Sequence, residues 1–87
     1  MPTAVKIAVY EYERGWGNRI DDWMVCISVK DALNFKKDFN SKNVEENVPD
    51  WYMVCKDEPE PIDLNDAQFE LLKNKGNLWL SSLKLIS

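Results

Sequence analysis

Histidine is absent from the 87-residue sequence, and only two cysteines occur in it. The lack of histidine excludes Ser-His-Asp and Cys-His nucleophilic catalysis, as well as every zinc site that uses an imidazole ligand. Two cysteines are too few for an all-cysteine tetrahedral zinc site within one chain. We therefore expect a protein without enzymatic activity, without a cofactor and without a metal site.

Long apolar runs are also absent. No stretch approaches the length of a membrane-spanning helix, and residues 1–3 lack the basic and apolar segments of a signal peptide. These two absences predict a cytoplasmic protein that does not contact a membrane. Cys26 and Cys55 each lie in an apolar run, which favours buried thiols, while a disulfide between neighbouring strands stays open as the alternative.

The composition is that of a folded domain, with 45% hydrophobic residues and four tryptophans. The length allows one modest core, so residues 1–87 are predicted to form a single domain. Residues 45–70 carry nine acids and one base, a net charge of −8, although the whole chain carries only −4. This asymmetry disfavours direct binding of nucleic acid and favours a cationic partner or simple solubility.

Alternating polarity predicts a hairpin in the first third of the chain. Residues 3–12 place Val5, Ile7 and Val9 on one face of a strand, and residues 20–27 alternate in the same way. The two strands should pair in an antiparallel manner across a loop at residues 14–19. We expect the odd-numbered strand residues to face the helices, and the opposite face to carry Tyr10, Tyr12, Met24 and Tyr52.

The remaining elements follow from caps, prolines and helical spacing. Ser28 and Asp31 form a capping box that begins a helix ending near residue 41, and a polar loop over residues 40–50 precedes a strand at residues 51–55. Pro59 and Pro61 oppose both helix and ladder formation in residues 56–61. A second helix, which either Asp63 or Asn65 can cap, is predicted over about residues 64–75. Residues 78–86 fit either a strand or a short helix, and we favour the strand.

The order β-β-α-β-α, followed by a closing strand, predicts an α+β domain. In such a domain two helices cover one face of a small, mostly antiparallel sheet. The opposite face then remains for a binding surface.

The hairpin loop is the first candidate site. Trp16 lies between two glycines and between Arg14 and Arg19, and tryptophan and arginine are enriched at interface hot spots. The predicted partner-binding site consists of Arg14, Trp16, Asn18 and Arg19 with Tyr10 and Tyr12. The alternative is structural: Trp16 folds back over the hairpin while the arginines pair with neighbouring acids.

Acidic residues give two further candidates. The acidic run can imitate DNA phosphates and so occupy a DNA- or RNA-handling enzyme, or it can be an ordinary solvated surface. The mimic would use Glu45, Glu46, Asp57, Glu58, Glu60 and Asp63. An enzyme that uses Glu11, Asp21 or Asp22 is the third hypothesis, and it requires a concave pocket near those acids. Asp21 and Asp22 are adjacent on a predicted strand, so they should point to opposite faces.

Two motifs carry a resemblance to a protein group. They are Tyr10-Glu11-Tyr12-Glu13-Arg14-Gly15-Trp16-Gly17, followed by Ile20-Asp21-Asp22, and Val48-Pro49-Asp50-Trp51-Tyr52-Met53. With these motifs the first two-thirds of the chain resembles small accessory proteins of tailed bacteriophages, a group with no assigned activity. The resemblance implies a setting in an infected bacterial cytoplasm, where many such proteins bind a host protein. The predicted function is therefore a non-enzymatic protein-binding module that modulates or inhibits a host protein.

Overall fold

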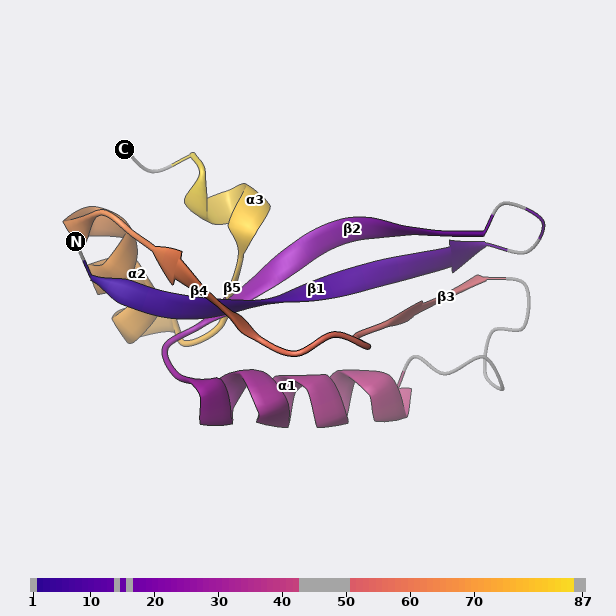
Figure 1. The fold of residues 1–87 in the computed structure, drawn as a ribbon. Coiled ribbons are helices and arrows are strands. Elements are labelled where there is room, and N and C mark those ends of the chain that lie inside the picture. Colours follow the sequence, from indigo (N-terminus) through magenta and orange to yellow (C-terminus); the bar gives the residue numbers. More distant parts are fainter. Residues whose placement is uncertain (1, 14, 16, 43–50, 86–87) are drawn as a thin grey trace.

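The computed structural model describes residues 2–13, 15, 17–42 and 51–85 (Figure 1). Its elements in chain order are β1 (Thr3–Glu13), β2 (Gly17–Cys26), α1 (Val29–Lys42), β3 (Trp51–Val54), β4 (Glu60–Asp63), α2 (Asp66–Lys75), β5 (Leu78–Trp79) and α3 (Leu80–Leu83). All strand pairs are antiparallel, which confirms the predicted α+β class.

β1 is the central strand of the sheet. Along one side it pairs with β2, as predicted, although β2 begins at Gly17, inside the segment that was predicted to be a loop. Along its other side it pairs first with β4, through Thr3 to Lys6, and then with β3, through Tyr10 to Glu13. β5 adds a short pairing to the outer side of β2, at Met24 and Val25.

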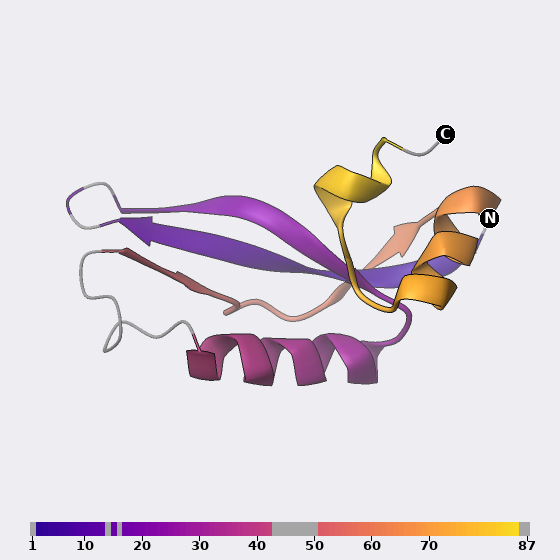
Figure 2. The same cartoon turned by 180° about the vertical axis from the view of Figure 1, so that it is seen from behind.

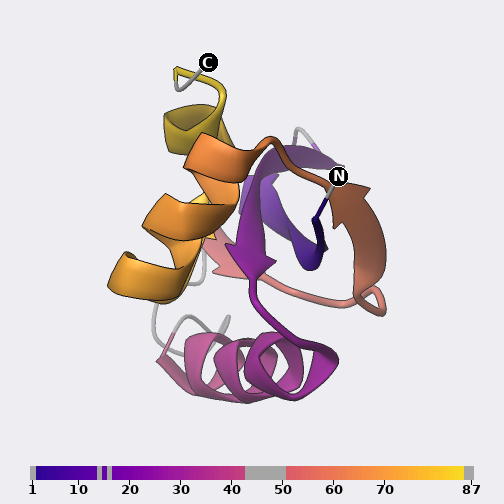
Figure 3. The ribbon, with the colours of Figure 1, turned by 90° about the vertical axis from the view of Figure 1, so that its left-hand side faces the viewer.

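Helices cover both faces of the sheet, whereas we expected two helices on one face. α1 packs over a core made of Ile7, Val9, Met24, Cys26, Ala32 and Cys55. A second core joins the strands to α2 and α3 and is made of Ala4, Val25, Leu64, Leu72 and Leu83. Figure 3 shows α1 on one side of the β1–β2 ribbon, with α2 and α3 away from it. The long twisted hairpin is apolar on both faces near its base, so both faces need a cover.

Odd-numbered residues of β1 face α1, as predicted, but the prediction that Met24 lies on the opposite face is wrong. The register pairs Ile7 with Met24, and residues that pair directly across two strands share a face of the sheet. From Asp22 to Cys26, even-numbered residues of β2 therefore face α1 together with the odd-numbered residues of β1. Met24 is buried in the first core and is absent from the opposite face.

The proline-containing segment forms a strand, which the sequence did not predict. β4 pairs with β1 over four residues, with Pro61 opposite Val5, and the Thr3 hydroxyl donates to Asp63 Oδ1 at 3.0 Å. β4 lies at the edge of the sheet. An edge strand needs ladder hydrogen bonds on one side only, so a proline without an N–H group is tolerated there.

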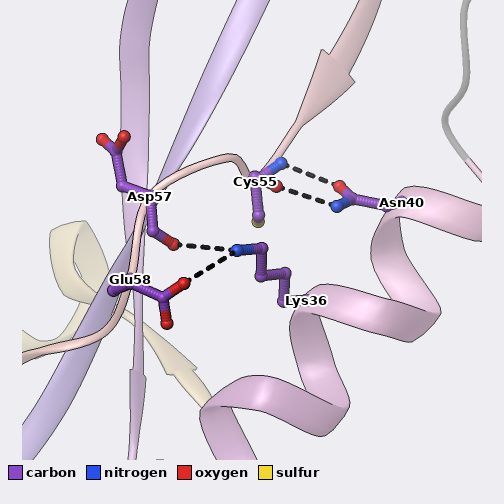
Figure 4. A network of polar contacts seen from close by, with 5 residues as sticks. All are labelled: Lys36, Asn40, Cys55, Asp57 and Glu58. Atoms are coloured by element: carbon purple, nitrogen blue, oxygen red, sulfur yellow. Dashed lines mark hydrogen bonds and ion pairs between the residues drawn. The ribbon is translucent and has the colours of Figure 1, made fainter.

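Between β3 and β4 the backbone leaves β1 and is held by α1 instead (Figure 4). The Asn40 carboxamide donates from Nδ2 to the Cys55 carbonyl and accepts at Oδ1 from the Cys55 N–H, both at 2.8 Å. Lys36 Nζ donates to the Asp57 carbonyl at 3.3 Å and lies 3.9 Å from Glu58 Oε1. Helix side chains thus replace the strand partner that the break removes.

The predicted start of α1 is confirmed, α2 begins at Asp66 after the second of its two predicted caps, and the predicted closing strand is wrong beyond Trp79. The Ser28 hydroxyl accepts from the Asp31 N–H at 3.3 Å, and Asn65 caps α2 with a reciprocal bond to Gln68. After β5 the chain turns into α3, because Leu83 inserts fully buried into the second core.

Cys26 and Cys55 are both buried free thiols, so the disulfide alternative does not hold.

Candidate functional site

The outer half of the hairpin carries three tyrosines on one face. The registers pair Tyr10 with Val54 and Ile20, and pair Tyr12 with Tyr52 and Asn18. Tyr10, Tyr12 and Tyr52 therefore lie on the face opposite α1, as predicted, and are called the tyrosine face below. α2 and α3 lie at the other end of the hairpin (Figures 1 and 2). None of the three described helices covers the tyrosine face, and its rings are half-buried.

Stacking and hydrogen bonds order the tyrosine face. The Tyr12 and Tyr52 rings are stacked, with centroids 4.9 Å apart and planes 3° from parallel. Lys56 Nζ donates to the Tyr12 hydroxyl at 2.9 Å and lies 4.6 Å from the Tyr10 ring centroid. The Tyr10 hydroxyl donates to the Asp57 carboxylate. Each ring is thus fixed by a neighbour, which is typical of a surface organised before binding.

These hydrogen bonds also favour the neutral form of Tyr10 and the charged form of Lys56. The bond to Asp57 raises the pKa of Tyr10, because it stabilises the protonated phenol. The bond to the Tyr12 hydroxyl raises the pKa of Lys56. Tyr10 is therefore neutral and Lys56 is a cation at physiological pH.

The predicted partner-binding residues do not form one surface. Asn18 pairs with Tyr12 in the register and belongs with the tyrosines, whereas Arg19 pairs with Glu11 on the other face. An Arg19 nitrogen lies 3.5 Å from Glu11 Oε2, so Arg19 follows the structural alternative of pairing with a neighbouring acid. Arg14 and Trp16 lie outside the described residues. Lys56 was missed because its position depends on how the chain leaves β3.

A β-bulge changes the prediction for Asp21 and Asp22. The β1–β2 register passes from Val9 with Asp22 to Tyr10 with Ile20, so Asp21 is the extra residue. A bulge breaks the alternation of a strand and re-aims its side chains. Both aspartates consequently line one pocket of about 320 Å³, called the bulge pocket below. Its lining residues are Asp21, Asp22, Phe39, Met53, Trp79 and Ser81.

Asp22 is fixed in the bulge pocket by hydrogen bonds. Its Oδ2 accepts from the Ser81 hydroxyl at 2.7 Å, and its Oδ1 accepts from the N–H groups of Trp23 at 2.7 Å and Ser81 at 3.4 Å. These bonds join β2 to the start of α3. Asp22 therefore has a structural role as well as a place in the pocket.

A second, smaller hollow lies near the tip of the hairpin. Its volume is about 160 Å³, and its lining residues are Glu11, Glu13, Gly17, Asn18 and Arg19. Concave surfaces thus exist near Glu11, Asp21 and Asp22, which is what the enzyme hypothesis requires of the structure. Within the described part of the chain, no group of three or more His, Cys, Asp or Glu side chains can hold a metal ion.

Four acids of the acidic run form ion pairs or hydrogen bonds with other residues of the chain. Lys36 lies near Glu58, Lys6 lies 3.5 Å from Glu60, and Asp57 and Asp63 accept from Tyr10 and Thr3. Each of these four acids has a partner within the chain, while Glu45 and Glu46 lie outside the described residues. The four do not form a bare row of negative charge.

Comparisons with known proteins identify no relative of this chain. No protein-family model matches the sequence, and neither curated proteins nor solved structures give a significant match. None of the described helices is both long enough and apolar enough to cross a membrane.

Proposed function

We propose that this chain is a non-enzymatic protein-binding module whose contact surface is the tyrosine face. The observation that carries the proposal is the stacked Tyr12–Tyr52 pair on a sheet surface that none of the described helices covers. Tyrosine offers a large apolar ring and a polar hydroxyl with few rotatable bonds, and it is enriched at protein interfaces for this reason.

The order of the tyrosine face supports the same proposal. Binding costs free energy when side chains lose rotamer freedom, and rings held by Lys56 and Asp57 have already lost it. Ile20, which pairs with Tyr10 across the hairpin and is 44% exposed, extends the surface with an apolar contact. The surface combines an aromatic centre with a polar rim, which is the usual anatomy of a protein interface.

The resemblance to phage accessory proteins suggests the identity of the partner. Such a setting favours a protein of the bacterial host, which this chain would modulate or inhibit from within the host cytoplasm. The tyrosine face would then occlude a functional surface of that protein.

Affinity capture from a nuclease-treated bacterial lysate, followed by mass spectrometry, would identify the partner. Calorimetry with the purified partner then compares the parent chain with Tyr12→Ala and Tyr52→Ala. Each variant should weaken binding by about tenfold or more, which corresponds to about 1.4 kcal/mol or more and is typical of a central aromatic contact. Asn34→Ala on the exposed side of α1 is the matched control and should bind like the parent.

Thermal melting separates lost contact from lost folding. Both tyrosine variants should melt cooperatively and only a few degrees below the parent. If the partner binds Tyr12→Ala and Tyr52→Ala as tightly as the parent, the tyrosine face is not the contact surface.

The acidic nucleic-acid mimic is the second candidate function. Glu60 and Asp63 lie on the edge strand β4, and Glu58 lies just before it; the Glu58 and Glu60 side chains stay 82% and 53% exposed although lysines lie near them. This function requires a basic DNA- or RNA-handling partner whose affinity falls steeply with salt. A Glu58→Gln, Glu60→Gln double variant that binds such a partner unchanged would rule it out.

A further inference from the structure

The bulge pocket combines negative charge with apolar walls. Of the six described residues that line it, two are aspartates and none is a lysine or arginine. Phe39, Met53 and Trp79 form the apolar wall, and the rings of Phe39 and Trp79 meet edge to face with centroids 6.5 Å apart. A ligand that satisfies both parts of the lining needs a cationic head and an apolar or planar body.

The carboxylates of Asp21 and Asp22 differ in the number of hydrogen bonds that they accept within the chain. Asp22 is oriented by three hydrogen bonds from Trp23 and Ser81. Asp21 is exposed, and among the described residues its carboxylate has no hydrogen-bond or ion-pair partner. Arg19, the nearest described arginine along the chain, is paired with Glu11 in the other hollow. The pocket therefore presents a fixed acid and an unused one beside the aromatic wall.

We propose that the bulge pocket binds the side chain of an arginine presented by a protein partner. The guanidinium group is planar, so it stacks on aromatic rings, and its forked donors match a carboxylate. The methylene stem of arginine packs along apolar surface while the head reaches the acids. A divalent metal ion is a poorer match, because it prefers a shell of oxygen ligands and half of this lining is apolar.

Lysine matches the lining less well than arginine does. Its ammonium group is compact and strongly hydrated, so it gains less from an aromatic wall than a guanidinium does.

The pocket lies on the α1 side of the sheet, away from the tyrosine face, because Met53 and Trp79 pack against the first core. The inference is thus independent of the proposed function, and the two can fail separately.

Titration of the ¹⁵N-labelled full chain with a short capped peptide that contains one arginine tests the inference. Saturable shifts are expected in the amide signals of Asp21, Asp22 and Ser81 and in the indole N–H signal of Trp79. A single side chain buries little surface, so a dissociation constant in the millimolar range is expected. The matched citrulline peptide has nearly the same shape without the charge and should bind at least about tenfold more weakly.

Variants locate the site. Asp21→Asn should weaken binding of the arginine peptide by about tenfold, since it removes the unused charge with little change in size. Asp21 is exposed, so the spectrum of the variant should otherwise match that of the parent. Tyr12→Ala, on the opposite face, should leave the titration unchanged. Equal binding of the citrulline peptide, equal binding of a lysine peptide, shifts confined to other residues or the absence of saturation would each overturn the assignment.

Discussion

Asn40→Ala should lower the free energy of unfolding by about 1.5 to 3.5 kcal/mol. The Asn40 carboxamide makes two hydrogen bonds of 2.8 Å to the backbone of Cys55, a residue that is 1% exposed. Alanine removes both bonds and leaves a buried N–H and a buried carbonyl without a protein partner. An unmade backbone hydrogen bond at a buried position costs more than the bond itself contributes.

The magnitude follows from the two bonds and one correction. Each bond contributes about 1 kcal/mol, and each buried group left unsatisfied adds up to about 1 kcal/mol more. Alanine is the better helix former, which returns about 0.5 kcal/mol. For a domain of this size the net loss corresponds to a fall of about 6 °C or more in Tm.

Urea denaturation followed by circular dichroism measures this loss. Asn34→Ala is the matched control, because Asn34 is an exposed residue of the same helix and its replacement reports helix propensity alone. Asn40→Asp keeps the acceptor for the Cys55 N–H but turns a carboxylate oxygen toward the Cys55 carbonyl. It should therefore be as destabilising at neutral pH and regain part of the loss on acidification. If Asn40→Ala unfolds at the same urea concentration as Asn34→Ala, the carboxamide does not support the break between β3 and β4.

Two other features give predictions that do not depend on a partner. Burial raises the pKa of the Cys26 thiol to about 12 and that of Cys55 to about 11, so neither should react with iodoacetamide at pH 8 until urea unfolds the chain. Since an unfolded thiol ionises near its ordinary pKa of 9.0, the stabilisation from both thiols is complete below about pH 9 and is lost as pH rises toward 11 to 12, which denaturation at several pH values would detect. Gly76 ends α2 with φ of +85°, so Gly76→Ala should cost about 1 kcal/mol in the same assay, although no atom lies within 4 Å of the added Cβ. Fast alkylation of the folded chain or an unchanged stability of Gly76→Ala would contradict these expectations.

The parts of the fold that the sequence predicted depend on short-range patterns. A period of two identified β1 and β2, the cap at Ser28 located the start of α1, and Asn65, one of two predicted caps, begins α2. The same period placed Tyr10 and Tyr12 on one face. Asn18 and Arg19 were predicted to lie in the loop, and their separation onto opposite faces follows from β2 beginning at Gly17.

The parts that the sequence did not predict depend on register between distant segments. The prolines of residues 56–61 argued against a strand, yet Glu60 pairs with Lys6 once the chain returns to β1. The position of the extra residue Asp21 is decided by which residues of β1 and β2 pair, and alternation within β2 does not reveal it. The bulge pocket follows from that bulge and from Trp79, which no local pattern brings to α1.

The central position of β1 has a consequence for the order in which the domain assembles. Its pairing with β2 joins Val5 to Cys26 and closes a short loop, whereas its pairing with β4 joins Thr3 to Asp63 across 60 residues. Closing a longer loop costs more chain entropy, and contacts between distant residues slow folding. The hairpin is therefore expected to form first and to serve as a template on which residues 51–63 are laid down later, with Asn40 and Lys36 holding that segment where it leaves the template.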